Sequence, residues 1–354
     1  MLGNKRGELG IKQFLIILAS AIILWIAVVL IFILPGQNRS FYTSGVPTCG
    51  DGSFYNTCSL DKPYYCSRGI LVANPLACGC PDSLTKSGNS CTSKYQTNQS
   101  SMVFHYVLNG RNMSVNYTLY GGFADYLSTL PDSITYTDGQ QPQKSDFVLM
   151  KLNNPIQQAF IEPLVKQIEN LAPTDKVTQA RIAISLVQNI PWGSSGKTVN
   201  FGAGAVNYSR YPYEVLYDNQ GLCGEKSELL VFLLRDLGYG TALFYYPQEN
   251  HETAGIKCPV QESVGGTGYC FIEASGPAIL SDDSLVYVGG VTLSESPEVV
   301  LISDGISLPD NLPEYNDART LESLSGRSWL DPISSAKLSQ LEQKYGLGQA
   351  YKID

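Results

Sequence analysis

The sequence predicts an α+β fold, because two segments with helical periodicity precede a third helix and several strand-like runs. In residues 155–171, and from Asp175 to about Ile190, apolar residues recur every three to four positions, which is typical of a buried helix face. Residues 241–246 and 269–273 are short runs rich in apolar and aromatic residues, as in buried strands. We therefore expect helices packed against a sheet.

An apolar run lies near the start of the chain. Phe14–Leu34 contains 21 uncharged, mostly apolar residues, and about 20 cross a bilayer as a helix. A cleaved signal peptide is the alternative, but its apolar region would be shorter, and Pro35 follows in place of a small-residue cleavage site. Basic residues gather before the run and only Arg39 lies close after it, which places residues 1–13 in the cytoplasm and residues 35–354 outside the cell membrane.

A cysteine-rich module is predicted at residues 49–91, after a polar linker at residues 35–48. It holds six of the nine cysteines, a density typical of disulfide-stapled modules in an oxidising compartment. A zinc cluster is the alternative, although the module has no CxxC pair and no histidine. The module is too small for a core without staples and is either a stalk or a ligand-binding unit. Five glycosylation sequons follow the apolar run: Asn38, Asn98, Asn112, Asn116 and Asn207.

Residues 92–145 are expected to form a β-hairpin and a connecting region. Alternating residues flank Asn109-Gly110 on both sides, a strong signal for a hairpin over 102–120. His105 occupies a strand position between two aromatic residues, and we expect it to be structural. Residues 307–354 are predicted to be a helical tail, with a helix near Ser334–Tyr345 that Gly346 ends.

Composition and charge exclude several classes of protein. The chain has 354 residues, of which 44% are hydrophobic, so it can bury a full core and is not disordered. Its formal net charge is -8, and its basic residues form no stripe or patch. We therefore expect no nucleic-acid partner.

Cys223 is the candidate nucleophile. Leucines from Leu229 to Leu237 mark one face of a helix that Gly238 closes. The same helix, extended backward, puts Cys223 in or just before its first turn. Unpaired backbone N–H groups and the helix dipole stabilise a thiolate at such a position. They could also donate to an oxyanion on an attacked carbonyl.

His251 and Glu273 are the candidate partners of this cysteine. His251 is one of two histidines, follows the predicted strand 241–246 and opens another strand. It would act as the base, and Glu273, at the end of the next strand, would orient the imidazole. Asp218 and Glu252 are the rivals for the role of the carboxylate.

The cysteine count also separates Cys223 from the other cysteines. If the six in the small module pair, Cys258 can pair with Cys270 across two strands, which leaves Cys223 unpaired. Cys258 is seven residues from His251, and Cys270 is three from Glu273. In regular strands both would point away from the face that bears His251 and Glu273.

These segments resemble the transglutaminase-like superfamily of papain-like thiol enzymes. The resemblance covers about residues 150–290 and implies a catalytic domain at residues 146–306, in which a helix bearing the cysteine packs on an antiparallel sheet. The family's third catalytic residue is usually Asp, whereas this chain has Glu. The spacing of 28 residues from Cys223 to His251 is shorter than the ~130 or more of papain-type proteases. The matching segments are Asp175 to Trp192, Tyr211-Pro-Tyr-Glu-Val-Leu, Gly221-Leu-Cys-Gly-Glu-Lys-Ser and Asn250-His-Glu-Thr-Ala-Gly.

The resemblance implies a membrane-anchored, extracytoplasmic thiol enzyme of prokaryotic or archaeal type. Its triad would be Cys223, His251 and Glu273, without a metal or cofactor. It would attack amide or ester carbonyls of cell-surface polypeptides through a thioester, with hydrolysis slightly favoured over acyl transfer. A non-catalytic surface binding module on the same scaffold is the alternative. A cysteine-rich adhesin with an incidental globular tail is a third possibility.

Overall fold

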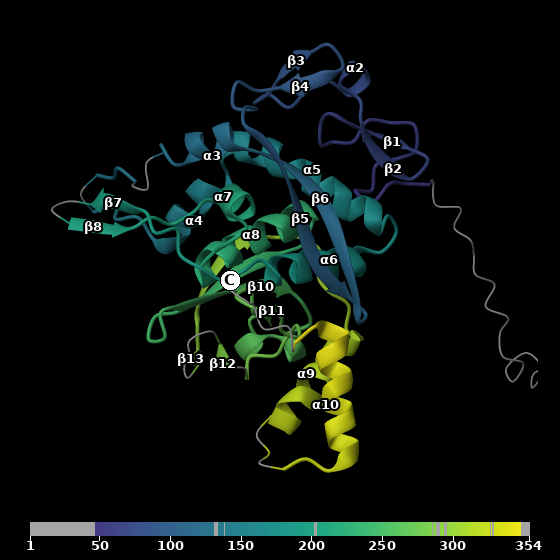
Figure 1. The fold of residues 1–354 in the computed structure, drawn as a ribbon, viewed down its shortest axis with the longest axis vertical. Coiled ribbons are helices and arrows are strands. Elements are labelled where there is room, and N and C mark those ends of the chain that lie inside the picture. The colour runs from purple at the N-terminus through teal and green to yellow at the C-terminus, as the bar shows by residue number, and fades with distance from the viewer. Residues whose placement is uncertain are drawn as a thin grey trace, which may run out of the picture. The chain divides into compact units, whose positions relative to one another are not determined.

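A four-stranded antiparallel sheet lies at the centre of the fold (Figure 1). Its strands, in spatial order, are β11 (Tyr269–Ile272), β10 (His251–Lys257), β9 (Thr241–Tyr246) and β14 (Glu298–Ser303). Each neighbouring pair is antiparallel. The mixture of helices and antiparallel sheets confirms the predicted α+β class, and the predicted strands ending at Tyr246 and beginning at Tyr269 are present. β14 was not predicted.

The computed structural model describes most of the chain beyond the apolar run. The described residues are 47–130, 134–137, 139–201, 204–284, 286–287, 291–293, 296–325, 327 and 329–347. The predicted transmembrane helix at Phe14–Leu34 and nearly all of the predicted linker lie outside them. Among the described residues no helix is long and apolar enough to cross a membrane. The anchor and its orientation therefore stay predictions.

Three long helices pack against the sheet or against one another, and the short helix α7 (Pro212–Asp218) lies between the second and third of them in the sequence. α8 (Cys223–Asp236) packs directly against β9 and β10, whereas α6 (Lys176–Gln188) and α5 (Pro155–Leu171) pack against α8 and each other. Short polar side chains cap the first turns of the latter two: Asn154 accepts from backbone N–H groups of α5, and Asp175 from one of α6. Both predicted helices are therefore confirmed, with starts set by these caps.

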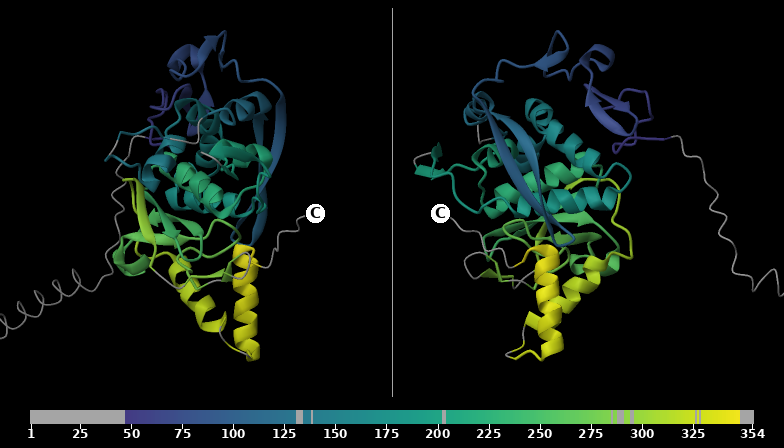
Figure 2. Two further views of the ribbon diagram at one scale, coloured as in Figure 1. Left: turned by 90° about the vertical axis from the view of Figure 1, so that its left-hand side faces the viewer. Right: turned by 45° about the vertical axis from the view of Figure 1, so that its right-hand side comes forward.

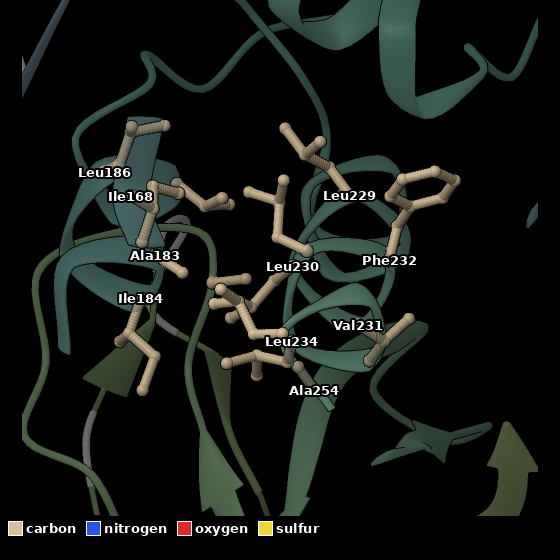
Figure 3. Packing of buried hydrophobic residues seen from close by; sticks show 14 of the residues in the cluster. Ile168, Ala183, Ile184, Leu186, Leu229, Leu230, Val231, Phe232, Leu234 and Ala254 are labelled. Carbon is tan, nitrogen blue, oxygen red and sulfur yellow. The ribbon is translucent and has the colours of Figure 1, made fainter. Parts of the chain in front are cut away.

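The middle of α8 lies in the main hydrophobic core. Every side chain from Leu229 to Leu234 is fully buried. In Figure 3, Leu230 and Leu234 point toward α6, and Ala254 of β10 lies beside them. Burying a leucine stabilises the fold by about 1.5–3 kcal/mol. This packing fixes where the N-terminus of α8 lies relative to the sheet.

The predicted hairpin is confirmed as β5 (Gln99–Leu108) and β6 (Arg111–Tyr120). Asn109 and Gly110 both have positive φ, as a tight hairpin turn requires. The hairpin runs along α6 (Figure 2), where Ser185 Oγ accepts a hydrogen bond from Val107 N at 2.8 Å. His105 is exposed on this hairpin.

Other short elements connect these parts. Two helices, α3 (Gly121–Leu127) and α4 (Lys144–Leu152), follow the hairpin and were not predicted. A small antiparallel hairpin of β7 (Thr198–Phe201) and β8 (Gly204–Asn207) lies between α6 and α8 in the sequence.

The cysteine-rich module is stapled as predicted. Its disulfides are Cys49–Cys66, Cys58–Cys78 and Cys80–Cys91, so all six cysteines are paired with one another. The module contacts α5 through Asp61, whose carboxylate lies 2.6 Å from Lys166 Nζ. Its elements are β1 (Tyr64–Ser67), β2 (Ile70–Ala73), α2 (Pro75–Cys78), β3 (Thr85–Ser87) and β4 (Ser90–Thr92).

The chain beyond the sheet forms a helical hairpin. α10 (Pro332–Tyr345) is the predicted helix, with Asp331 as its N-cap and Gly346 as its C-cap. α9 (Pro313–Ser325) precedes it and was not predicted. The remaining short elements are 3-10 turns at Val260–Glu262 and Val264–Gly266 and the strand pair β12 (Val286–Tyr287) and β13 (Val291–Thr292).

The predicted pairing of Cys258 with Cys270 is confirmed. This disulfide joins the chain after β10 to β11, with the two Cα atoms 5.7 Å apart. Cys223 is free, as the cysteine count predicted. The disulfide therefore ties together the two strands from which His251 and Glu273 emerge.

Loss of this disulfide should destabilise the protein. Replacing both Cys258 and Cys270 with alanine should lower the free energy of unfolding by about 2–4 kcal/mol, because the unfolded chain loses a constraint. Chemical denaturation measures the change. The matched control is the Cys80/Cys91 double alanine variant. Its two cysteines are 11 residues apart in the sequence, compared with 12 for Cys258 and Cys270, so the two disulfides close loops of similar length. Equal stability of wild type and the Cys258/Cys270 variant would contradict this account.

Candidate active site

Cys223 is the first residue of α8 and is half-buried. The carboxylate of Glu225 fixes this helix turn from within, because it accepts hydrogen bonds from Leu222 N and from Arg210 N, both at 2.8 Å. The Arg210 guanidinium lies 3.0 Å from the same carboxylate. The thiol is therefore held at the positive end of the helix, as the sequence predicted.

His251 and Glu273 lie in contact at the ends of neighbouring strands. His251 is the first residue of β10, and Glu273 directly follows β11. His251 Nε2 and Glu273 Oε2 are 2.9 Å apart, and the residues are 6% and 2% exposed. The other oxygen of Glu273 accepts from Ser275 N at 2.6 Å. The carboxylate is thus fixed by two hydrogen bonds, one of which orients the imidazole.

Hydrogen bonding with the Cys223 thiol also acts on the pKa of the imidazole, so the three predicted residues are coupled through His251. Burial disfavours the charged imidazole, but the hydrogen bonds with Cys223 and Glu273 and their charges outweigh it and raise the pKa of His251 to about 9. Because Nε2 contacts the carboxylate, Nδ1 is left for the thiol. His251 is accordingly an imidazolium at neutral pH, placed between two groups that carry negative charge when ionised.

The two rival carboxylates are engaged elsewhere. Asp218 Oδ2 lies 2.7 Å from Arg210 Nε. Glu252 is next to His251 in sequence, yet its carboxylate lies 2.5 Å from Lys144 Nζ. Glu273 is therefore the carboxylate that the structure places against His251.

Two buried polar residues near the site, Lys226 and Gln188, were not predicted from the sequence. Lys226 is 0% exposed, and its Nζ lies 2.6 Å from Ile190 O and 2.9 Å from Ser275 O. Gln188 Nε2 donates to Glu273 O at 2.9 Å. The signal was present, because Lys226 falls three and four positions before Leu229 and Leu230, inside the apolar stripe of its helix.

The arrangement brings together a thiol, an imidazole and a carboxylate that orients the imidazole, a set of groups that can carry out covalent acyl chemistry. In the part of the chain that the structure describes, no group of three or more His, Cys, Asp or Glu side chains is placed to hold a metal ion.

No known family model matches this chain, and no curated protein matches it. The likeness to transglutaminase-like enzymes therefore rests on the sequence motifs.

His251 should titrate well above an ordinary histidine. Folding raises its pKa from 6.5 to about 9, so the stabilisation from its charged form is complete below about pH 6.5 and is lost as the pH rises through about 9. Side-chain ¹⁵N spectra measured against pH should show this, and Cys223→Ala should lower the pKa of His251. A His105→Gln variant assigns the two histidine signals. A His251 midpoint at or below pH 6.5 in the wild type would refute the proposed contacts.

Proposed function

We propose that this protein is a thiol acyl-transfer enzyme whose catalytic triad is Cys223, His251 and Glu273. The chain of contacts from the Cys223 thiol through the His251 ring to the Glu273 carboxylate is the observation that carries the proposal. A thiol, an imidazole and a carboxylate in this order are sufficient to generate a thiolate and to shuttle one proton. The placement of Cys223 at the start of a helix packed on an antiparallel sheet supports a papain-like, transglutaminase-like core.

The reaction would begin when the Cys223 thiolate attacks the carbonyl carbon of an amide or ester. Negative charge develops on the carbonyl oxygen, and backbone N–H groups in the first turn of α8 are suited to donate hydrogen bonds to that oxygen. The carbon–nitrogen or carbon–oxygen bond then breaks, and His251 gives its proton to the leaving amine or alcohol. A thioester on Cys223 remains.

Water or an amine would resolve the thioester. His251, now neutral, takes a proton from the incoming nucleophile, which attacks the carbonyl and breaks the carbon–sulfur bond. Water yields a carboxylic acid, and an amine yields a new amide. With the predicted extracytoplasmic location, we favour polypeptides at the cell surface as substrates and hydrolysis as the main outcome.

Glu273 would act through His251. Its carboxylate stabilises the imidazolium and, through its contact with Nε2, fixes the orientation of the ring, which leaves Nδ1 for the thiol. A glutamate is one methylene longer than the aspartate usual in the family. Ser275 N donates a hydrogen bond to the second carboxylate oxygen of Glu273, and this bond restrains the position of the longer side chain.

Acylation of Cys223 can be tested with p-nitrophenyl acetate, an activated ester that needs no specific recognition. The wild type should release a burst of p-nitrophenolate, and peptide mass spectrometry should locate an acetyl group on Cys223. Cys223→Ala should abolish both signals, because the only free thiol among the described residues is gone. The His105→Gln variant should behave like the wild type. Absence of a burst from folded wild-type protein, or acetylation elsewhere, would favour the non-catalytic binding module.

Replacement of Glu273 should weaken the reaction without abolishing it. Glu273→Gln keeps the shape of the side chain but removes the charge that stabilises the imidazolium, so the acylation rate should fall by about 10²- to 10⁴-fold. Asp218→Asn and Glu252→Gln are the matched controls and should have much smaller effects, because their carboxylates pair with Arg210 and Lys144. If either control is the more damaging substitution, Glu273 is not the third member of the triad.

A further inference from the structure

Lys226 is a buried lysine that interacts electrostatically with two members of the candidate triad, Cys223 and Glu273. It lies one helical turn after Cys223, and its side chain is wholly enclosed. Its Nζ is 2.6 Å from Ile190 O, 2.9 Å from Ser275 O and 3.3 Å from Gln188 O. The lysine thereby joins the nucleophile helix to the end of α6 and to the segment that follows β11.

The segment held in this way is the one that presents Glu273. Gln188, which ends α6, donates its side-chain amide to Glu273 O at 2.9 Å and to Ala278 O at 3.1 Å. Lys226 Nζ donates hydrogen bonds to Ser275 O of the same segment and to the backbone carbonyl of Gln188. Two buried side chains therefore hold three carbonyls of residues 273–278.

The number of acceptors favours the charged form of Lys226. An ammonium has three N–H donors, one for each carbonyl, whereas a neutral amine has two and would leave one buried carbonyl unsatisfied. Burial lowers the pKa of Lys226 to about 7, while the charges of Glu273 and Cys223 act in the opposite direction. The ionisable groups that face it are thus Cys223 on its own helix and Glu273 beside β11, with His251 of β10 bonded to both.

We propose that Lys226 is a positioning residue of the triad, whose ammonium holds the Glu273 segment in place and favours the thiolate form of Cys223. This inference rests on the proposed function. The positive charge stabilises a negative sulfur, and the carbonyl contacts keep Glu273 within reach of His251. The effect of Lys226 on the thiolate differs from that of the helix dipole, because it depends on whether this one side chain is protonated.

The pH dependence of Cys223 alkylation tests this role. Full-length wild type, Lys226→Met and Lys226→Gln are treated with iodoacetamide across a range of pH, and labelling is quantified by mass spectrometry. Both substitutions remove the charge, whereas glutamine keeps amide donors for the carbonyls. We expect the midpoint of the labelling curve to move upward by about one pH unit in both variants. Lys166→Gln is the matched control, since Lys166 is also buried but lies among Asp61, Glu162 and Glu169 on and near α5; its curve should match the wild type.

A purely structural role for Lys226 would give a different result. Lower thermal stability with an unchanged labelling curve in both Lys226 variants would overturn the inference. If neither variant folds, the reciprocal measurement decides, because coupled groups affect each other equally: the Nζ signal of Lys226 should titrate at lower pH in Cys223→Ser than in wild type. An unchanged Nζ titration would overturn the inference. Wild-type protein that shows no ester burst would instead refute the proposed function itself.

Discussion

The fixed position of α8 against the central sheet is the constraint on which the rest of the site depends. The helix is buried from Leu229 to Leu234, so it cannot turn or slide without opening the core. Its first residue is Cys223, and the strand it contacts most is β10, which begins with His251. The next strand, β11, leads into Glu273. One packed helix and two paired strands thereby bring together residues that are up to 50 positions apart.

Buried charge is concentrated along the first two turns of the same helix. Glu225 pairs with Arg210, Glu228 pairs with Lys151, and Lys226 bonds to backbone carbonyls. Burial raises the pKa of Glu228 to about 7, which reflects the cost of enclosing such groups. Apolar residues would often serve stability as well or better at these positions. Of these groups, Lys226 is the one whose charge we propose acts on Cys223.

The sequence predicted those helices and strands that a short apolar run or a clear end signal specifies. The strands 241–246 and 269–272 and the helix α10 have apolar runs or clear end signals, and the structure gives them nearly the same bounds. α9 was missed because its sequence is largely polar, and β14 because an isolated apolar run does not reveal its partner strand. The sequence favoured Glu273 as the end of a strand but left Asp218 and Glu252 as rivals, because it does not show which carboxylate lies beside His251. Lys226 was detectable in principle as a charge inside an apolar stripe.

The most direct test of the central claim is alkylation of Cys223 at mildly acidic pH, two to three units below the ordinary thiol pKa of about 8.5. The rate of labelling by iodoacetamide is compared between wild type and His251→Asn, with folding checked by circular dichroism. If Cys223 and His251 form an ion pair, the wild type should be labelled readily and the variant at least tenfold more slowly, a difference of about 1.4 kcal/mol. Equal rates in the two folded proteins would contradict the claim that His251 activates Cys223.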